Sequence, residues 1–108
     1  MGIICIIDLK SIIDVTSILT CGQARKILSK IFNQNPNFMT FSKHALEEME
    51  KDNLKTGDIL NVLKAGKIFD APEFENGSYR YRVQTQKIMV VIAFRKTNHV
   101  VIVTAWRK

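Results

Sequence analysis

Apolar residues recur at the spacing of helices in the first part of the chain and at the spacing of strands after Lys67. In the segment QARKILSKIF, which follows Gly22, four apolar side chains share one helical face and three basic side chains take the other. This pattern predicts an amphipathic helix. The helix is expected to end at the following NQNPN stretch, because the residue before Pro36 is driven out of the helical backbone conformation.

Two further helices are predicted from their capping residues. Ser42 is a favourable N-cap, and the helix that follows it is expected to stop near Asn53. Thr56 can cap the next helix, in which Asp58 suits the positive end of the helix dipole. Gly66 suits the position just after the last turn of that helix.

The first 20 residues allow two interpretations. Their leucine and isoleucine side chains lie near helical spacing, but β-branched residues also allow a strand at the start. Asp8 interrupts the apolar run Ile3–Ile7 and no basic residue precedes it, so the run makes neither a convincing signal peptide nor a membrane span. Cys5 and Cys21 lack metal-ligand spacing and are expected to form a buried, reduced pair in a reducing compartment.

The last part of the chain alternates apolar and polar residues, which is typical of strands. Runs rich in β-branched and aromatic residues lie at about Tyr79–Thr85, Lys87–Arg95 and Val100–Arg107. They predict an antiparallel meander, whose edge a short strand around Ile68 and Phe69 could join through the Asn76-Gly77 turn signal. We therefore expect an α+β fold, with N-terminal helices followed by an antiparallel meander of three to four strands.

Tight loops at Thr85-Gln86 and Thr97-Asn98 would set the register of the meander. They place Val91 opposite Thr104, Met89 opposite Trp106, and Arg82 opposite Met89. One face then carries Arg80, Arg82, Met89, Val91, Ala93, Arg95, Thr104 and Trp106, and the other carries Tyr81, Val83, Ile88, Val90, Ile92, Phe94, Val101 and Val103. The second face is expected to be the core, since nearly all its members are apolar.

Composition indicates a single folded domain of 108 residues, because 46% of them are apolar and 24% are charged. The net charge is +6. Residues 67–108 hold eight basic and three acidic side chains, a charge of +5, and the rest of the chain contributes only +1. This asymmetry favours an anionic partner such as RNA or an acidic protein, although basic surface can also serve solubility alone.

The cationic face of the predicted sheet has the properties of a binding surface. Arginine side chains border an apolar floor, and Trp106 lies on that floor. Arginine can grip phosphate with two parallel hydrogen bonds, and an indole offers a stacking platform for an unpaired base. The alternative is that a helix covers the floor, which would leave Trp106 in the core and the arginines at its rim.

The order of motifs from Phe41 to Lys108 resembles a family of small bacterial toxins. The motifs are SKHALEEM, DILNVLKAG, YRYRV, IMVVIAF and VVIVTAWRK. They are similar to the RelE-like and MqsR-like ribonuclease toxins of the barnase, EndoU, colicin and RelE (BECR) fold group. Residues 1–40 fall largely outside the resemblance and would form a helical segment before the toxin-like module of residues 41–108.

The resemblance implies metal-independent cleavage of RNA, in which the ribose 2′-hydroxyl attacks the neighbouring phosphate. Its catalytic residues would be His44 as acid or base, Arg80 and Arg82 as phosphate ligands, and Thr104 as a hydrogen-bond donor. Its RNA-positioning residues would be Lys43, Arg95, Trp106 and Arg107. Such a toxin needs no cofactor, acts in the cytoplasm of its own or a target cell, and has an antitoxin or immunity protein, expected to be acidic, as partner.

Other functions stay open at this stage. From the residues alone, His44 can also be a solvated histidine at a helix start. Tyr81 is a reserve proton donor, although alternation sends its side chain to the core side. The same cationic face would also suit a module that binds RNA or an acidic protein without cleaving anything, and a shared fold does not fix function. No metal, nucleotide or dinucleotide motif is present in the sequence.

Overall fold

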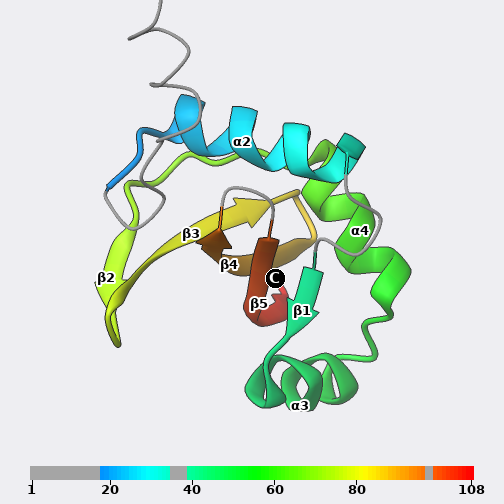
Figure 1. Cartoon of the computed structure of the whole chain (residues 1–108). Helices are drawn as coiled ribbons and strands as arrows, with labels where there is room; N and C mark the ends of the chain where they lie inside the picture. The colour runs from blue at the N-terminus through cyan, green and yellow to red at the C-terminus, as the bar shows by residue number, and fades with distance from the viewer. Residues whose placement is uncertain (1–17, 35–38, 97–98) are drawn as a thin grey trace, which may run out of the picture.

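The molecule combines helices with one sheet, and most of its strands follow the helices in the chain. The computed structural model describes residues 18–34, 39–96 and 99–108. Its helices are α2 (Cys21–Gln34), α3 (Lys43–Lys51) and α4 (Thr56–Ala65). Its strands are β1 (Met39–Phe41), β2 (Glu73–Glu75), β3 (Ser78–Gln84), β4 (Ile88–Lys96) and β5 (His99–Arg107). The α+β class is confirmed, with the helices leading into a largely antiparallel sheet (Figure 1).

The sheet has the strand order β1-β5-β4-β3-β2. Strands β3, β4 and β5 form the predicted antiparallel meander. Strand β1 pairs with β5 in parallel, with Met39 beside Val100 and Phe41 beside Ile102. The sequence does not predict β1, because three residues are too short to show an alternating pattern. The free edge of β5 supplies the hydrogen-bond partners that make this segment a strand.

Strand β2 forms a hairpin with β3 around Asn76 and Gly77. Both residues have positive φ angles, 50° and 82°, as the tightest hairpin turns require. The turn was expected, but the strand on its other side is Glu73–Glu75. The expected strand around Ile68 and Phe69 is wrong, since only the neighbouring Lys67 makes an isolated bridge to Gln84.

The expected register between β4 and β5 is confirmed from Ile88 to Val91, and the expected register between β3 and β4 is wrong. Val91 pairs with Thr104 and Met89 with Trp106, as expected. Arg82 pairs with Val91 and not with Met89, because the turn from β3 to β4 is centred on Gln86-Lys87, one residue beyond the expected Thr85-Gln86 loop. The backbone N–H of Thr85 closes this loop by donating to the carbonyl of Ile88. A slip of two residues leaves every side chain on its predicted face.

Two β-bulges interrupt the pairing of β4 with β5, one between Val91 and Ile92 and one between Phe94 and Lys96. The first inserts Val103 into β5 as an extra residue. Between the two bulges, the residues of β5 that were expected on the core side lie on the opposite side of the sheet. The expectation that Val101 and Val103 lie in the core is therefore wrong. Val100 and Ile102 are fully buried in their place. Such an insertion re-aims side chains, which matters for the site described below.

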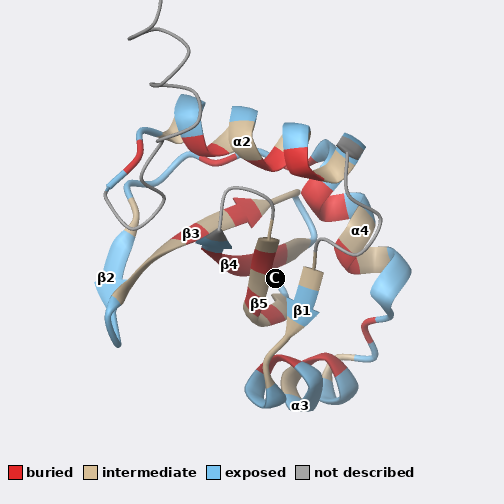
Figure 2. Cartoon of the chain, viewed as in Figure 1, coloured by how far each residue is buried: buried red, intermediate tan, exposed pale blue. Residues whose placement is uncertain are grey.

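The core lies between the sheet and the pair of helices α2 and α4, which contact each other while α4 also contacts β3 and β4. Leu28, Ile59 and Leu63 are fully buried there (Figure 2). Tyr81 is also fully buried, and its hydroxyl oxygen accepts a hydrogen bond of 3.0 Å from the backbone N–H of Leu19. The predicted core side of β3 is therefore confirmed, and the hydroxyl ties the segment before α2 to the sheet.

The helix boundaries follow the predicted caps with one difference. Ser42 caps α3, since its hydroxyl accepts from the N–H of Ala45 at 3.0 Å. At α4 the capping position is Lys55 and not Thr56, and the Asp58 carboxylate accepts from the Lys55 N–H at 2.9 Å. Carboxylates at this position also complement the helix dipole.

Gly66 ends α4 with an ordinary negative φ angle of −73°. The reason for a glycine is space: an added Cβ would lie 2.5 Å from the carbonyl oxygen of Val62 and 3.0 Å from that of Gln84. The glycine therefore lets the end of α4 approach the sheet closely.

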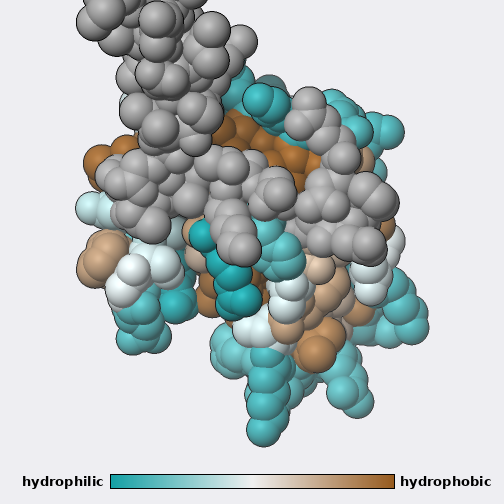
Figure 3. Space-filling view, viewed as in Figure 1, coloured by the Kyte–Doolittle hydropathy of each residue, from teal (hydrophilic) through white to brown (hydrophobic). Residues whose placement is uncertain are grey.

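The surface is mixed in character. Hydrophilic side chains prevail over α3, and hydrophobic ones gather below α2 (Figure 3). No helix of the described residues combines the length and the apolar character that crossing a membrane requires. Cys21 is a half-buried free thiol that donates to the carbonyl of Asp70, and Cys5 lies outside the described residues, so the expected buried pair stays a prediction.

Candidate active site

A cavity of about 300 Å³ lies against the sheet on the side of Arg80 and Arg82. These side chains alternate along β3 with the core residues Tyr81 and Val83, so the cavity is on the face that α2 and α4 do not cover. The cavity is lined by His44, Glu73, Glu75, Arg80, Arg82, Val91, Val103, Thr104 and Trp106. Helix α3 and four strands thus contribute to one site.

The structure brings together the four residues that the resemblance implies as catalytic. His44, Arg80, Arg82 and Thr104 all line the cavity, and so does Trp106. They come from elements up to 60 residues apart in the chain. Alternation along β3 and the pairing of β4 with β5 explain why the arginines and Thr104 meet on one face.

The apolar floor of the site is narrower than the sequence suggests. Met89, Val91 and Ala93 are each only 8% exposed, and only Val91 among them lines the cavity. Trp106 is half-buried and borders the same cavity, so it is neither a core residue nor a free platform. The half-buried side chain of Trp106 therefore forms one edge of the cavity.

The β-bulge at Val103 shapes the wall of the site. Because of the extra residue, the consecutive residues Val103 and Thr104 both line the cavity, which regular alternation would forbid. The carbonyl oxygen of Val103 accepts a hydrogen bond of 2.8 Å from the hydroxyl of Ser42. The backbone N–H of Ser42 donates in turn to the carbonyl of Ile102 at 3.0 Å. The start of α3 is thereby fastened to the bulge.

This fastening places His44 at the cavity, because His44 is the second residue of α3 and lies two residues after Ser42. Its side chain is exposed and borders the cavity. Within the described part of the chain, its imidazole has no hydrogen-bond partner. The exposed imidazole is therefore accessible to a ligand that enters the cavity.

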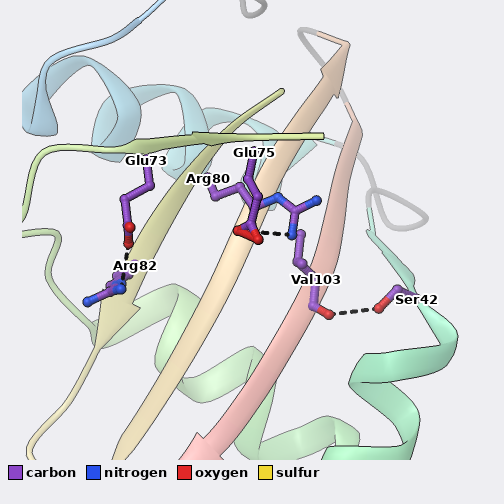
Figure 4. A network of polar contacts seen from close by, with 6 residues as sticks. All are labelled: Ser42, Glu73, Glu75, Arg80, Arg82 and Val103. Atoms are coloured by element: carbon purple, nitrogen blue, oxygen red, sulfur yellow. Dashed lines mark hydrogen bonds and ion pairs between the residues drawn. The ribbon is translucent and has the colours of Figure 1, made fainter. Parts of the chain in front are cut away.

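The two arginines of the site are both in ion pairs with strand β2 (Figure 4). Arg82 Nη2 donates to Glu73 Oε1 at 2.5 Å. Arg80 Nη1 lies 3.9 Å from Glu75 Oε2, a looser contact. The Nε of Arg80 is buried and has no hydrogen-bond partner among the described residues. The site therefore holds two cations, two carboxylates and one imidazole.

Comparison with known families covers the part of the chain that builds this site. A family described as "Domain of unknown function (DUF4258)" matches residues 41–107. The chain belongs to this family. No match was found among curated proteins or among solved structures.

The DUF4258 part of the chain contains every residue that lines the cavity, from His44 to Trp106. It also contains Ser42, which fastens α3 to the bulge. Helix α2 lies outside it, contributes Ala24, Leu28 and Ile31 to the core, and is joined to the end of α4 by hydrogen bonds from Arg25 to the carbonyls of Leu63 and Lys64. The family domain is thus the unit that carries the candidate site, while the N-terminal segment completes its hydrophobic core.

Three expected RNA-positioning residues do not line this cavity of the DUF4258 domain. Lys43 is exposed at the start of α3, and Arg95 is exposed within the second bulge of β4. The side chain of Arg107 donates to the backbone carbonyls of Asp52 and Asn53, at 2.8 and 3.2 Å. Arg107 therefore donates to carbonyls at the end of α3 that have no partner within the helix, and this contact stabilises the fold.

Glu73 and Glu75 are the charged site residues that sequence reasoning missed. A signal for them was present, because a two-residue turn at Asn76-Gly77 places Glu75 opposite Ser78 and Glu73 opposite Arg80. Assigning the edge strand to Ile68 and Phe69 hid this register. No group of three or more metal-ligating side chains is found among the described residues, although two carboxylates and an imidazole border one cavity.

Proposed function

We propose that this protein is a metal-independent endoribonuclease toxin of a toxin-antitoxin or toxin-immunity pair. The observation that carries the proposal is that His44, Arg80 and Arg82 line a single cavity. The fold supports it, since the order of helices and meander is the one expected of the RelE-like and MqsR-like toxins that the motifs resemble. The partner would be an acidic protein, and the toxin would act in a cytoplasm.

The reaction would begin with attack of a ribose 2′-oxygen on the adjacent phosphorus. The new bond from the 2′-oxygen to phosphorus forms as the bond to the 5′-oxygen breaks, which leaves a 2′,3′-cyclic phosphate and a free 5′-hydroxyl. A base takes the proton of the 2′-hydroxyl and an acid returns one to the 5′-oxygen. His44 would exchange one of these protons, and its position at the cavity supports this role.

The arginines would stabilise the additional negative charge of the phosphorane. Guanidinium groups offer forked donors that fit two phosphate oxygens, and their charge attracts the transition state more than the ground state. The Nη1 of Arg80, which Glu75 approaches only to 3.9 Å, would be one donor for this purpose. Thr104 would donate a further hydrogen bond, and Trp106 would stack on a neighbouring base.

The proposal is tested by incubating the purified protein with total RNA in EDTA and analysing the fragment ends. Wild-type protein is expected to leave cyclic phosphate ends, and a His44→Ala, Arg82→Ala double variant is expected to leave the RNA intact. Lys30→Ala is the matched control, because it removes an exposed cation of α2 outside the cavity. Cleavage by the double variant at the wild-type rate would refute the assignment of these residues.

A non-catalytic module that binds RNA or an acidic protein is the second candidate. It is favoured by one feature: within the described residues, His44 has no hydrogen-bond partner that would orient it as an acid or base. This module would bind RNA in a salt-dependent manner and leave it uncut. Intact RNA after incubation with folded wild-type protein, together with such binding, would replace the first proposal by this one.

A further inference from the structure

Strand β2 carries two carboxylates that occupy the arginines of the candidate site. Glu73 pairs with Arg82 at 2.5 Å and Glu75 lies 3.9 Å from Arg80. A carboxylate presents two oxygens to guanidinium donors in much the same geometry as two oxygens of a phosphate. The free protein therefore holds its own anions where a phosphate ligand would bind.

These ion pairs are exposed enough to be exchanged. The side chains of Glu73 and Glu75 are 66% and 64% exposed. Pairs in contact with water contribute little to stability, because solvent screens the attraction and ordering two long side chains costs entropy. Every residue of β2 is exposed, and the strand pairs with β3 at only three positions. The strand is thus an element that can yield its contacts without disturbing the core.

The contact at Arg80 is also incomplete. Its side chain is only 20% exposed, and its Nε is buried without a partner among the described residues. Glu75 approaches the Nη1 atom alone, at a distance longer than a hydrogen bond. A ligand oxygen that reached both Nε and Nη1 would satisfy donors that Glu75 leaves open.

The two arginines are spaced for consecutive anions. Arg80 and Arg82 stand two residues apart on one face of β3, which corresponds to about 6.8 Å along an antiparallel strand. Neighbouring phosphates of one nucleic-acid strand can face such a pair. The carboxylates of Glu73 and Glu75 have the same two-residue spacing on β2.

We propose that Glu73 and Glu75 mimic two consecutive phosphates of the RNA and are displaced from Arg82 and Arg80 when RNA binds. The proposal rests on the proposed function in that it takes the displacing anion to be RNA. It makes the two glutamates determinants of specificity: they compete with every anion, so only a ligand that replaces both contacts binds well. They also keep the site formally neutral in charge until the ligand arrives.

The test measures binding of a labelled single-stranded oligonucleotide that carries 2′-O-methyl groups and cannot be cleaved. The Glu73→Gln, Glu75→Gln variant is expected to bind about tenfold more tightly than wild type at low salt. The slope of the logarithm of affinity against the logarithm of salt concentration should stay close to the wild-type value, because the arginines contact the same two phosphates in both complexes. Each single variant should give a smaller gain in affinity than the double variant.

The matched control is Glu50→Gln, Asp70→Asn, which changes the net charge by the same amount at exposed positions outside the cavity. It should leave both affinity and slope close to wild type. Equal binding by the Glu73→Gln, Glu75→Gln variant and this control would overturn the inference, because overall charge alone would then explain any gain.

Pyrophosphate serves as a second probe that separates the two proposals. Tighter pyrophosphate binding by the double glutamine variant, without oligonucleotide binding by any variant, would overturn RNA as the ligand and retain the displaceable carboxylates. Unchanged binding of both probes would overturn the displacement while leaving RNA cleavage by the wild-type protein a separate question. Tighter binding of both probes would support the inference in full.

Discussion

The hydroxyl of Ser42 donates a hydrogen bond of 2.8 Å to the carbonyl oxygen of Val103, the extra residue of the bulge in β5. The same hydroxyl accepts from the N–H of Ala45 and so begins α3. One side chain therefore performs two tasks: it caps the helix that carries His44 and holds that helix against the wall of the cavity. This contact is the basis of the first prediction.

Replacing Ser42 by alanine should reduce both stability and RNA cleavage. Loss of the cap is expected to lower the free energy of unfolding by about 1 kcal/mol, and loss of the bond to Val103 adds a cost of similar size. Because His44 would be held less firmly, kcat should fall more than KM rises. Chemical denaturation and cleavage kinetics measure the two effects, and Ser42→Thr should restore most of both.

Thr20→Ala is the matched control for this prediction. Thr20 accepts from the N–H of Gln23 at the start of α2, so the substitution removes a cap that lies outside the DUF4258 domain. It should lower stability while cleavage by the folded protein stays at the wild-type rate. An equal loss of cleavage in both variants would show that stability, and not the position of His44, is responsible.

Stability should decline in alkaline solution because of Tyr81. Burial raises the pKa of its phenol above the ordinary value of 10.0, and the hydrogen bond from Leu19 offsets this only in part. The unfolded chain therefore loses the Tyr81 proton at a lower pH than the folded chain does. The stabilisation is complete below pH 10 and is lost as the pH rises from there towards the folded pKa.

Tyr81→Phe should remove this alkaline component while lowering stability at neutral pH by about 1 kcal/mol, since the Leu19 N–H loses its acceptor. Denaturation curves between neutral and alkaline pH provide the measurement. Tyr79→Phe is the control and should keep the alkaline decline. Cleavage by folded Tyr81→Phe should be unchanged, because the phenol faces the core; a large loss would instead make Tyr81 a participant in catalysis.

Arg107→Ala should act on stability and not on RNA recognition. Its side chain donates to the carbonyls of Asp52 and Asn53, so its loss is expected to cost about 1 kcal/mol at this exposed position. Arg82→Ala should weaken oligonucleotide binding much more than Arg107→Ala does. Equal weakening by both would return Arg107 to the RNA-positioning role that the resemblance implies.

The two glycines of the α4 region should respond to alanine in opposite ways. Gly66→Ala places a Cβ 2.5 Å from the carbonyl oxygen of Val62 and should destabilise the protein by about 1 to 3 kcal/mol. Gly57→Ala meets no atom within 4 Å inside the helix and should stabilise it by about 0.5 to 1 kcal/mol. Thermal melting of both variants decides the point, and a stabilised Gly66→Ala would contradict the close approach of α4 to the sheet.

Local patterns in the sequence were sufficient to place the helices and to sort much of the sheet into two faces. Alternation is a property of any strand, so Arg80 and Arg82 share a face whatever lies beside them. The same rule sends Tyr81 to the core, where it is fully buried. Ser42 could be recognised as a cap because the groups that it satisfies belong to the turn that follows it.

The geometry of the site depended on contacts between distant segments. The bulge at Val103 arises from the pairing of two whole strands, and one residue more or less in β5 reverses its faces, so the expectation for Val101 and Val103 failed. Strand β1 exists because β5 offers it an edge. The meeting of Glu73 with Arg82 needed the correct hairpin. Short-range propensity therefore determined the helices and the three strands of the meander, whereas pairing and packing between elements decided the edge strands and which charged side chains share the cavity, because these interactions are non-local.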